Sequence, residues 1–171
     1  DEIMRRTIIL DFIDKYITEK IYKKAREREK EFLPDNFTAY YLRDSVMYWF
    51  VIFLLFVIFT FTFGLYDKIF LYILSVASIV SFLIVLYHIS YLCIVDDTGM
   101  KIRRFWIFEK QILWEDVKKV EVRKFESYSK PLEKHVIIRN KQNKIIFTCS
   151  YDLVGFDLIV KKAKKERKKK H

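Results

Sequence analysis

Two long apolar runs dominate the pattern of hydrophobic and polar positions along the chain. They cover residues 46–66 and 69–95 and are separated only by Asp67 and Lys68. An uncharged run of about 18 residues or more can cross the hydrocarbon core of a bilayer as a helix. The pattern therefore predicts a hairpin of two membrane-spanning helices. The alternative is a pair of buried helices in a soluble protein, but a chain of 171 residues offers little polar structure to enclose them.

The chain before the hairpin has the pattern of an amphipathic helix over residues 1–32. Its apolar stripe consists of isoleucines at every fourth position, Ile9, Ile13, Ile17 and Ile21. The stripe could lie on the membrane, pack against the rest of the protein or pair with a second copy. The balanced charges on the opposite face favour packing against protein. Pro34 is expected to end the helix, and residues 33–45 are interpreted as a linker.

Beyond the hairpin the hydrophobic period changes from that of a helix to that of strands. About six short antiparallel strands are expected, with turns near Glu109 and Lys110 and at residues 140–143, and a loop at residues 127–134. A last helix, capped by Asp152, follows with its own apolar face. The sequence thus predicts an α+β membrane protein in three parts: residues 1–45 (amphipathic helix and linker), 46–95 (hairpin) and 96–171 (a small sheet domain closed by a helix).

Two motifs in the third part are similar to those of bacterial pleckstrin-homology-like (PH-like) domains. In the run VDDTGMKIRRF the matching positions are Asp97, Gly99, Met100 and Ile102. In the run QILWEDVKKVEV they are Trp114, Glu115, Asp116 and Val117. The chain resembles the membrane proteins of that family in which a two-helix hairpin precedes a cytoplasmic PH-like domain. The resemblance covers about residues 93–165. It implies a partly open, bent antiparallel β-barrel or sheet closed by the last helix, and the role of an adaptor.

Charge is unevenly distributed along the chain. The residues before the hairpin carry ten cations and ten acids, whereas those after it carry 21 cations and 11 acids, so the whole formal net charge of +10 lies in the C-terminal part. Lys and Arg are retained on the cytoplasmic side of a membrane, and the turn holds one cation, Lys68. Both termini are therefore expected in the cytoplasm, and the resemblance favours a bacterial plasma membrane. The basic domain should be attracted to anionic lipid headgroups, whereas tethering beside a bilayer disfavours nucleic acid.

Two sets of residues are candidate binding surfaces. The first, for a ligand or lipid, consists of Lys101, Arg103, Arg104, Trp106, Lys118, Lys119 and Arg123. The second, for contact with the membrane surface, consists of Lys161, Lys162, Lys164, Lys165, Arg167 and Lys168. For both sets the alternative interpretation is a solvated face of a basic protein.

The sequence holds no pattern typical of catalysis or of a cofactor. It has three glycines and no phosphate-binding loop, no HExxH motif and no paired cysteines, so neither an enzymatic activity nor a metal or other cofactor is expected. Asp96 and Asp97 are expected to form a turn and Trp114 to anchor the core. Cys93 and Cys149 are expected to be free buried thiols.

Three functions remain open from the sequence. The first is a non-enzymatic, membrane-anchored adaptor or accessory subunit that binds a partner protein, a second copy of itself or an anionic membrane surface. The second is a membrane effector that senses a small anionic ligand, such as a nucleotide, and oligomerises to disrupt the bilayer. The third is an immunity protein against a membrane-active peptide.

Overall fold

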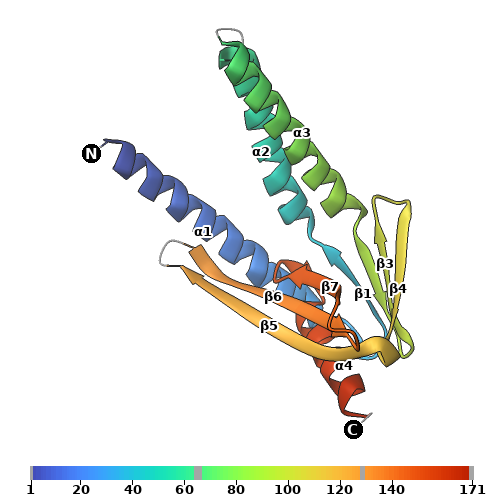
Figure 1. Cartoon of the computed structure of the whole chain (residues 1–171). Coiled ribbons are helices and arrows are strands. Elements are labelled where there is room, and N and C mark those ends of the chain that lie inside the picture. The colour runs from blue at the N-terminus through green and yellow to red at the C-terminus, as the bar shows by residue number, and fades with distance from the viewer. Residues whose placement is uncertain (1, 64–66, 128–129, 170–171) are drawn as a thin grey trace.

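Two long helices stand out from the rest of the chain and form a hairpin (Figure 1). The computed structural model describes residues 2–63, 67–127 and 130–169. Helix α2 covers Arg43–Phe63 and α3 covers Lys68–Ser90, and both are long and apolar enough to cross a membrane. The prediction of two such helices is confirmed, while residues 64–66, at the expected end of the first, lie outside the described residues. The second helix is shorter than its apolar run, because Leu92–Val95 forms strand β2.

Small side chains let the two hairpin helices approach each other closely. Ser81 of α3 is buried, and the Ser78 hydroxyl lies 3.4 Å from the Thr60 hydroxyl of α2. Such contacts between small or hydroxyl-bearing residues are typical of helix pairs in membranes. At the turn, the Asp67 carboxylate accepts a hydrogen bond of 2.7 Å from the Ile69 amide and caps α3.

Within the described ranges of the chain, eight strands form two antiparallel sheets. Besides β2 they are β1 (Phe37–Tyr41), β3 (Gly99–Arg104), β4 (Phe108–Leu113), β5 (Val117–Ser127), β6 (Lys130–Asn140), β7 (Ile145–Ser150) and β8 (Leu153–Val154). One sheet has the order β4-β3-β2-β1-β8, and the other has the order β5-β6-β7. The α+β class is therefore confirmed. The sheets are not closed into a barrel, so the expected barrel is corrected to two separate sheets.

Strand β1 lies where the sequence predicted a linker. It pairs with β2 on one side and β8 on the other, with Ala39 opposite Cys93 and Phe37 opposite Val95. The alternation of FTAYY buries Phe37, Ala39 and Tyr41 on one face. The hairpin is consequently inserted between two neighbouring strands of one sheet. α2 begins directly after β1, and α3 ends directly before β2.

Three turn and cap predictions are also corrected. The β3–β4 turn lies at residues 105–107, because Glu109 and Lys110 belong to β4. The expected loop at residues 127–134 is mostly strand, with residues 128–129 outside the described part. Helix α4 (Phe156–Lys168) has Gly155, at φ 98°, as its N-cap instead of Asp152. Glycine suits that left-handed backbone position because it has no Cβ.

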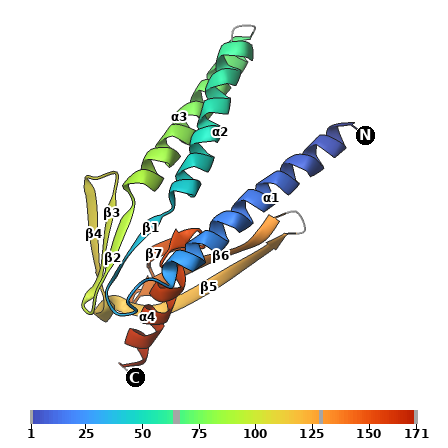
Figure 2. The same ribbon diagram turned by 180° about the vertical axis from the view of Figure 1, so that it is seen from behind.

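One hydrophobic core joins the two sheets and α4. Its largest fully buried side chains are Phe147, Phe156, Met100, Ile102 and Ile138. Trp114 is part of this core, in the short 3-10 helix Trp114–Asp116, and its indole N–H donates 2.8 Å to the Asp96 carbonyl, so the predicted anchor is confirmed. α4 lies at the end of the molecule opposite the tip of the hairpin (Figures 1 and 2).

Helix α1 (Glu2–Glu29) packs on β6 and β8 through its second half. Ile21 and Ala25 are buried there, which confirms packing against protein, whereas Ile13 remains 48% exposed. The charged C-terminal end of α1 is partly buried. Glu29 is buried, and its carboxylate accepts a hydrogen bond of 2.6 Å from the Leu158 amide near the start of α4. This bond compensates for part of the cost of burying the carboxylate.

Candidate functional site

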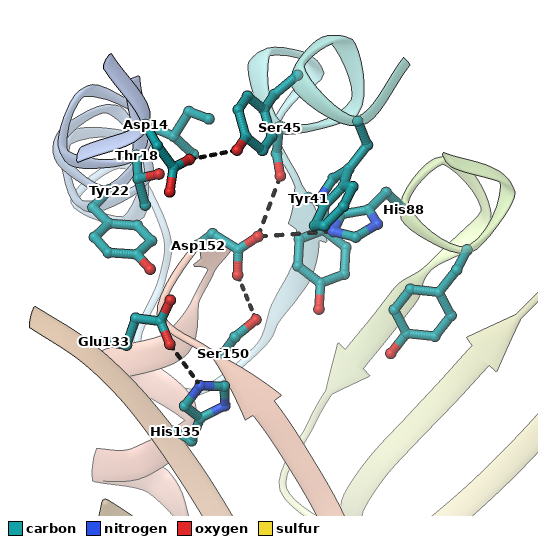
Figure 3. Close-up of a pocket in the computed structure, with 14 residues that line it drawn as sticks. Asp14, Thr18, Tyr22, Tyr41, Ser45, His88, Glu133, His135, Ser150 and Asp152 are labelled. Carbon is teal, nitrogen blue, oxygen red and sulfur yellow. Dashed lines mark hydrogen bonds and ion pairs between the residues drawn. The ribbon is translucent and has the colours of Figure 1, made fainter. Parts of the chain in front are cut away.

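A cavity of about 460 Å³ lies where α1, the base of the hairpin and the second sheet meet (Figure 3). We call it the junction pocket. Its lining residues are Asp14, Thr18, Ile21, Tyr22, Tyr41, Ser45, Tyr48, Trp49, Tyr87, His88, Glu133, His135, Ser150 and Asp152. Three helices and both sheets therefore contribute side chains to one site.

Regular backbone spacing places these side chains on the pocket's walls. Asp14, Thr18 and Tyr22 recur every four residues and so share one face of α1. Glu133 and His135 are two residues apart on β6 and share one face of that strand. The first turns of α2 and the last turn of α3 complete the wall, since the inserted hairpin ends at the sheet.

Asp152, between β7 and β8, is the residue on which the elements converge. Its carboxylate accepts hydrogen bonds from the Ser150 hydroxyl of β7 and, at 3.2 Å, from the Ser45 hydroxyl of α2. His88 of α3 faces the same carboxylate, with Nε2 3.8 Å from the nearer oxygen. Burial opposes ionisation of this carboxyl, but the contacts with His88, Ser150 and Ser45 outweigh burial and lower its pKa below the ordinary value. Asp152 thus links both hairpin helices to the sheets.

Ser45, His88 and Asp152 are the residue types of a hydrolase triad, but they are connected differently. In a triad the serine donates to the imidazole, and the carboxylate orients the opposite ring nitrogen. Here Ser45 and Ser150 both donate to the carboxylate, and Nδ1 of His88 lies 2.8 Å from the Ile84 carbonyl. This geometry is that of a structural network that ties the hairpin to the sheets.

The electrostatic character of the junction pocket is acidic and aromatic. Three carboxylates line it, Asp14, Glu133 and Asp152, and no Lys or Arg is among its described lining residues. Burial raises the pKa of Tyr22 well above its ordinary value, and the charges of the same three acids raise it further. A pocket with this potential opposes anions, although the chain as a whole carries a net charge of +10.

Three further hydrogen bonds hold the walls in place. The Tyr48 hydroxyl of α2 donates to the Asp14 carboxylate of α1, which bridges the two helices across the pocket. Further along α1, Arg26 donates to the Tyr151 carbonyl at 2.9 Å and to the Leu153 carbonyl. α1 is therefore fixed both to the hairpin and to the segment that carries Asp152.

The first set of sequence-predicted residues is divided between the two sheets. Lys101 and Arg103 are exposed on the same face of β3, and Lys101 pairs with Glu109 at 2.9 Å. Arg104 and Trp106 lie at the end of that strand and in the turn that follows. The remaining residues, Lys118, Lys119 and Arg123, belong to β5 of the other sheet. There Glu121 pairs with Lys119 and with Arg123.

The second set lies on α4, and one member is corrected. Lys162 is 3% exposed, and its ammonium pairs with Asp97 at 2.6 Å and Asp35 at 3.3 Å. A side chain covered in this way cannot lie on a membrane surface. The other members are Lys161, Lys164, Lys165, Arg167 and Lys168, and α4 carries them at the end of the molecule away from the hairpin tip (Figure 1).

Sequence reasoning missed the junction pocket. It treated Asp152 as a helix cap and gave no role to His88. The two residues are 64 positions apart in the chain, and only the fold brings them together. The four-residue spacing of Asp14, Thr18 and Tyr22 was a usable signal, because it marks a polar strip on α1 beside the apolar one.

Residues within the run VDDTGMKIRRF, which resembles PH-like domains, have structural roles. Asp96 accepts hydrogen bonds from the Thr98 and Gly99 amides, at 2.7 and 2.9 Å, which confirms the predicted turn. A Cβ on Gly99 would lie 2.1 Å from the Ile112 carbonyl oxygen, so this position has no room for a side chain. No protein-family model, curated protein or solved structure matches the chain.

Proposed function

We propose that this chain is a non-enzymatic, membrane-anchored adaptor. In this proposal α2 and α3 cross the membrane, both termini and both sheets lie in the cytoplasm, and the junction pocket receives an ammonium group of a partner protein. The observation that carries the proposal is the junction pocket itself: an acidic, aromatic cavity at the base of the hairpin. The PH-like resemblance, with its hairpin before a sheet domain, agrees with this plan.

Exposure of the hairpin supports the membrane placement. None of the residues in the most apolar stretch of α2 is buried, and 11% of those in α3 are. A core helix of a soluble protein would be covered by other elements, whereas large side chains such as Leu55, Ile58 and Val80 are about half exposed. Their hydrophobic surface requires an apolar environment, which a bilayer supplies.

The chemistry of the junction pocket supports an ammonium ligand. Carboxylates attract a cation, and the faces of aromatic rings stabilise an ammonium group by cation–π interaction. Five aromatic side chains line the pocket: Tyr22, Tyr41, Tyr48, Trp49 and Tyr87. A lysine of a partner fits this chemistry better than a lipid headgroup does, because Ile13 and Tyr16 are exposed on α1 beside Asp14 and offer the partner apolar contact.

The other two functions receive less support from the structure. An effector that senses a nucleotide needs a cationic site, and the junction pocket has the opposite charge. The basic face of β3 remains available to an anion, but Glu109 already pairs with Lys101 there. The exposed hairpin alone does not distinguish an immunity protein from an adaptor or an effector.

Thermal unfolding of the full-length protein in detergent tests the proposed ligand. A short peptide with one lysine should raise the midpoint, and the same peptide with that lysine acetylated should not. The Asp14→Asn/Glu133→Gln double variant should lose the response, and Glu115→Gln, on the surface away from the pocket, should keep it. Stabilisation by nucleotides instead would support the effector. Stabilisation by phosphatidylethanolamine but not by the peptide would identify a lipid headgroup as the ligand.

A further inference from the structure

The β3–β4 turn and the first residue of β4 carry three consecutive large apolar side chains that the protein leaves uncovered. Trp106 is 56% exposed, Ile107 is 80% exposed and Phe108 is 67% exposed. We call residues 105–108 the apolar tip. An exposed run of this kind on one short turn is unusual for a surface in water and is typical of a contact site.

The backbone of the apolar tip is strained. Phe105 and Trp106 have positive φ angles, 51° and 59°. Tight turns of this kind favour Gly, Asn or Asp, because a Cβ crowds the backbone in the left-handed region. Bulky aromatic residues occupy these positions here, and such strain is commonly found at functional sites.

Hydrogen bonding and packing fix the apolar tip at the end of α3. The Phe105 amide donates to the hydroxyl of Ser90, the last residue of α3, at 2.8 Å. The Phe105 ring lies 5.9 Å from the ring of Tyr87. Figure 1 shows the end of the β3–β4 hairpin beside the C-terminal end of α3. If α3 crosses a bilayer, the tip lies at the depth where that helix emerges from it.

We infer that the apolar tip inserts into the boundary between headgroups and acyl chains of the leaflet from which α3 emerges. This inference rests on the proposed membrane placement of the hairpin. The last turn of α3, to which the tip is fixed, also carries an exposed apolar side chain, Ile89, which is 51% exposed. Trp is enriched at that depth of a bilayer because its ring is apolar and its N–H is polar.

Charge next to the apolar tip agrees with a lipid surface as the occupant. Arg103 is exposed on the strand that leads into the tip, and Lys110 is exposed on the strand that leaves it, while Lys101 of the first strand is paired with Glu109. Cations just behind an inserted apolar turn lie at the depth of the lipid phosphates. The tip would thereby give the domain a second attachment to the membrane and hold the junction pocket in one orientation.

Fluorescence quenching in proteoliposomes tests this insertion. The full-length protein carries an environment-sensitive fluorophore on one introduced cysteine, Ile107→Cys at the apolar tip, Ile58→Cys on α2 or Lys164→Cys on α4. The native Cys93 and Cys149 are buried, so the unmodified chain serves as the labelling blank. The vesicles contain phosphatidylcholine with a minority of phosphatidylglycerol, plus phosphatidylcholine that bears a doxyl quencher near the headgroup or deep in the chain.

The label at Ile107→Cys should lose most of its emission to the quencher near the headgroup. The label at Ile58→Cys should lose most of its emission to one of the two quenchers. The label at Lys164→Cys should lose none. Quenching of Ile58→Cys without quenching of Ile107→Cys would overturn the inference and leave the hairpin placement intact. A blue shift at Ile107→Cys that depends on protein concentration but not on quencher would also overturn it, in favour of a second copy. Quenching at neither site would overturn the membrane placement and the inserted tip together.

Discussion

Asp152 is the residue through which the hairpin and the sheets are joined, and its contacts predict a stability effect. Asp152→Asn keeps the shape of the side chain but removes the charge that faces His88 and weakens the hydrogen bonds from Ser45 and Ser150. Loss of a buried, hydrogen-bonded charge costs about 2–3 kcal/mol. Chemical unfolding in detergent should show this loss for Asp152→Asn and a change within about 0.5 kcal/mol for the exposed control Glu115→Gln.

The lowered pKa of Asp152 gives the same contact a pH dependence. A carboxyl whose pKa is lower in the folded state stabilises the fold above its unfolded pKa, about 3.9, and loses that contribution as the pH falls through the folded value. The stability difference between the wild type and Asp152→Asn should therefore shrink on acidification from about pH 6 to pH 3. A difference that grows over this range would contradict the assigned role.

Lys162 and Lys161 are neighbours in sequence with opposite environments. Lys162 packs its aliphatic stem in the interior and reaches Asp97 and Asp35 with its ammonium, whereas Lys161 is exposed. Lys162→Ala should lower the free energy of unfolding by about 1–2 kcal/mol, and Lys161→Ala should leave it nearly unchanged. Equal effects in a denaturant titration would show that Lys162 is not a structural residue.

Residue environments could be predicted from sequence where they depend on near neighbours. The Asp96 turn follows from the residues beside it, and the buried free thiols follow from the apolar strands that hold them. Burial raises the pKa of Cys93 to about 12 and that of Cys149 well above its ordinary value, as expected for unreactive thiols. Buried Glu29 and Lys162 could not be predicted, because their partners are up to 129 positions away.

At the scale of elements, the insertion of the hairpin between β1 and β2 is the feature that sequence patterns did not indicate. The two hairpin helices could be predicted from their long apolar runs, because such runs are visible in the sequence without knowledge of the fold. β1 has five residues and its partner begins 51 positions later, so its strand character depends on a pairing that local alternation does not show. The same holds for residues 130–134, which pair only after β5 and β6 come together.

The direct pairing of β1 with β2 predicts that the sheets do not need the hairpin to fold. Replacement of residues 43–90 by a short Asn-Gly turn keeps Tyr40 opposite Leu92 and converts the insertion into an ordinary strand hairpin. The shortened chain should be folded without detergent, with the β-rich circular dichroism and cooperative unfolding of a packed domain. A chain that remains unfolded would show that the hairpin contributes to the core.

At the scale of the whole molecule, the two ends differ in character. The hairpin forms one end and α4 with the C-terminus forms the other, so the lysines of α4 lie far from the surface that the hairpin would occupy (Figure 2). The net charge of +10 suggested a tail on the membrane. Our proposal instead gives membrane contact to the hairpin and the apolar tip. Composition alone could not reveal this, because the number of charged residues does not show where in the fold those residues lie.

The most direct test of the account is the side of the membrane on which each end of the molecule lies. A membrane-impermeant thiol reagent is applied to cells that express Asp67→Cys or Lys164→Cys, with Cys93 and Cys149 buried in both. The account predicts that Asp67→Cys reacts in intact cells and that Lys164→Cys reacts only after permeabilisation. Reaction of both positions from the same side would contradict the membrane-spanning hairpin and the adaptor built upon it.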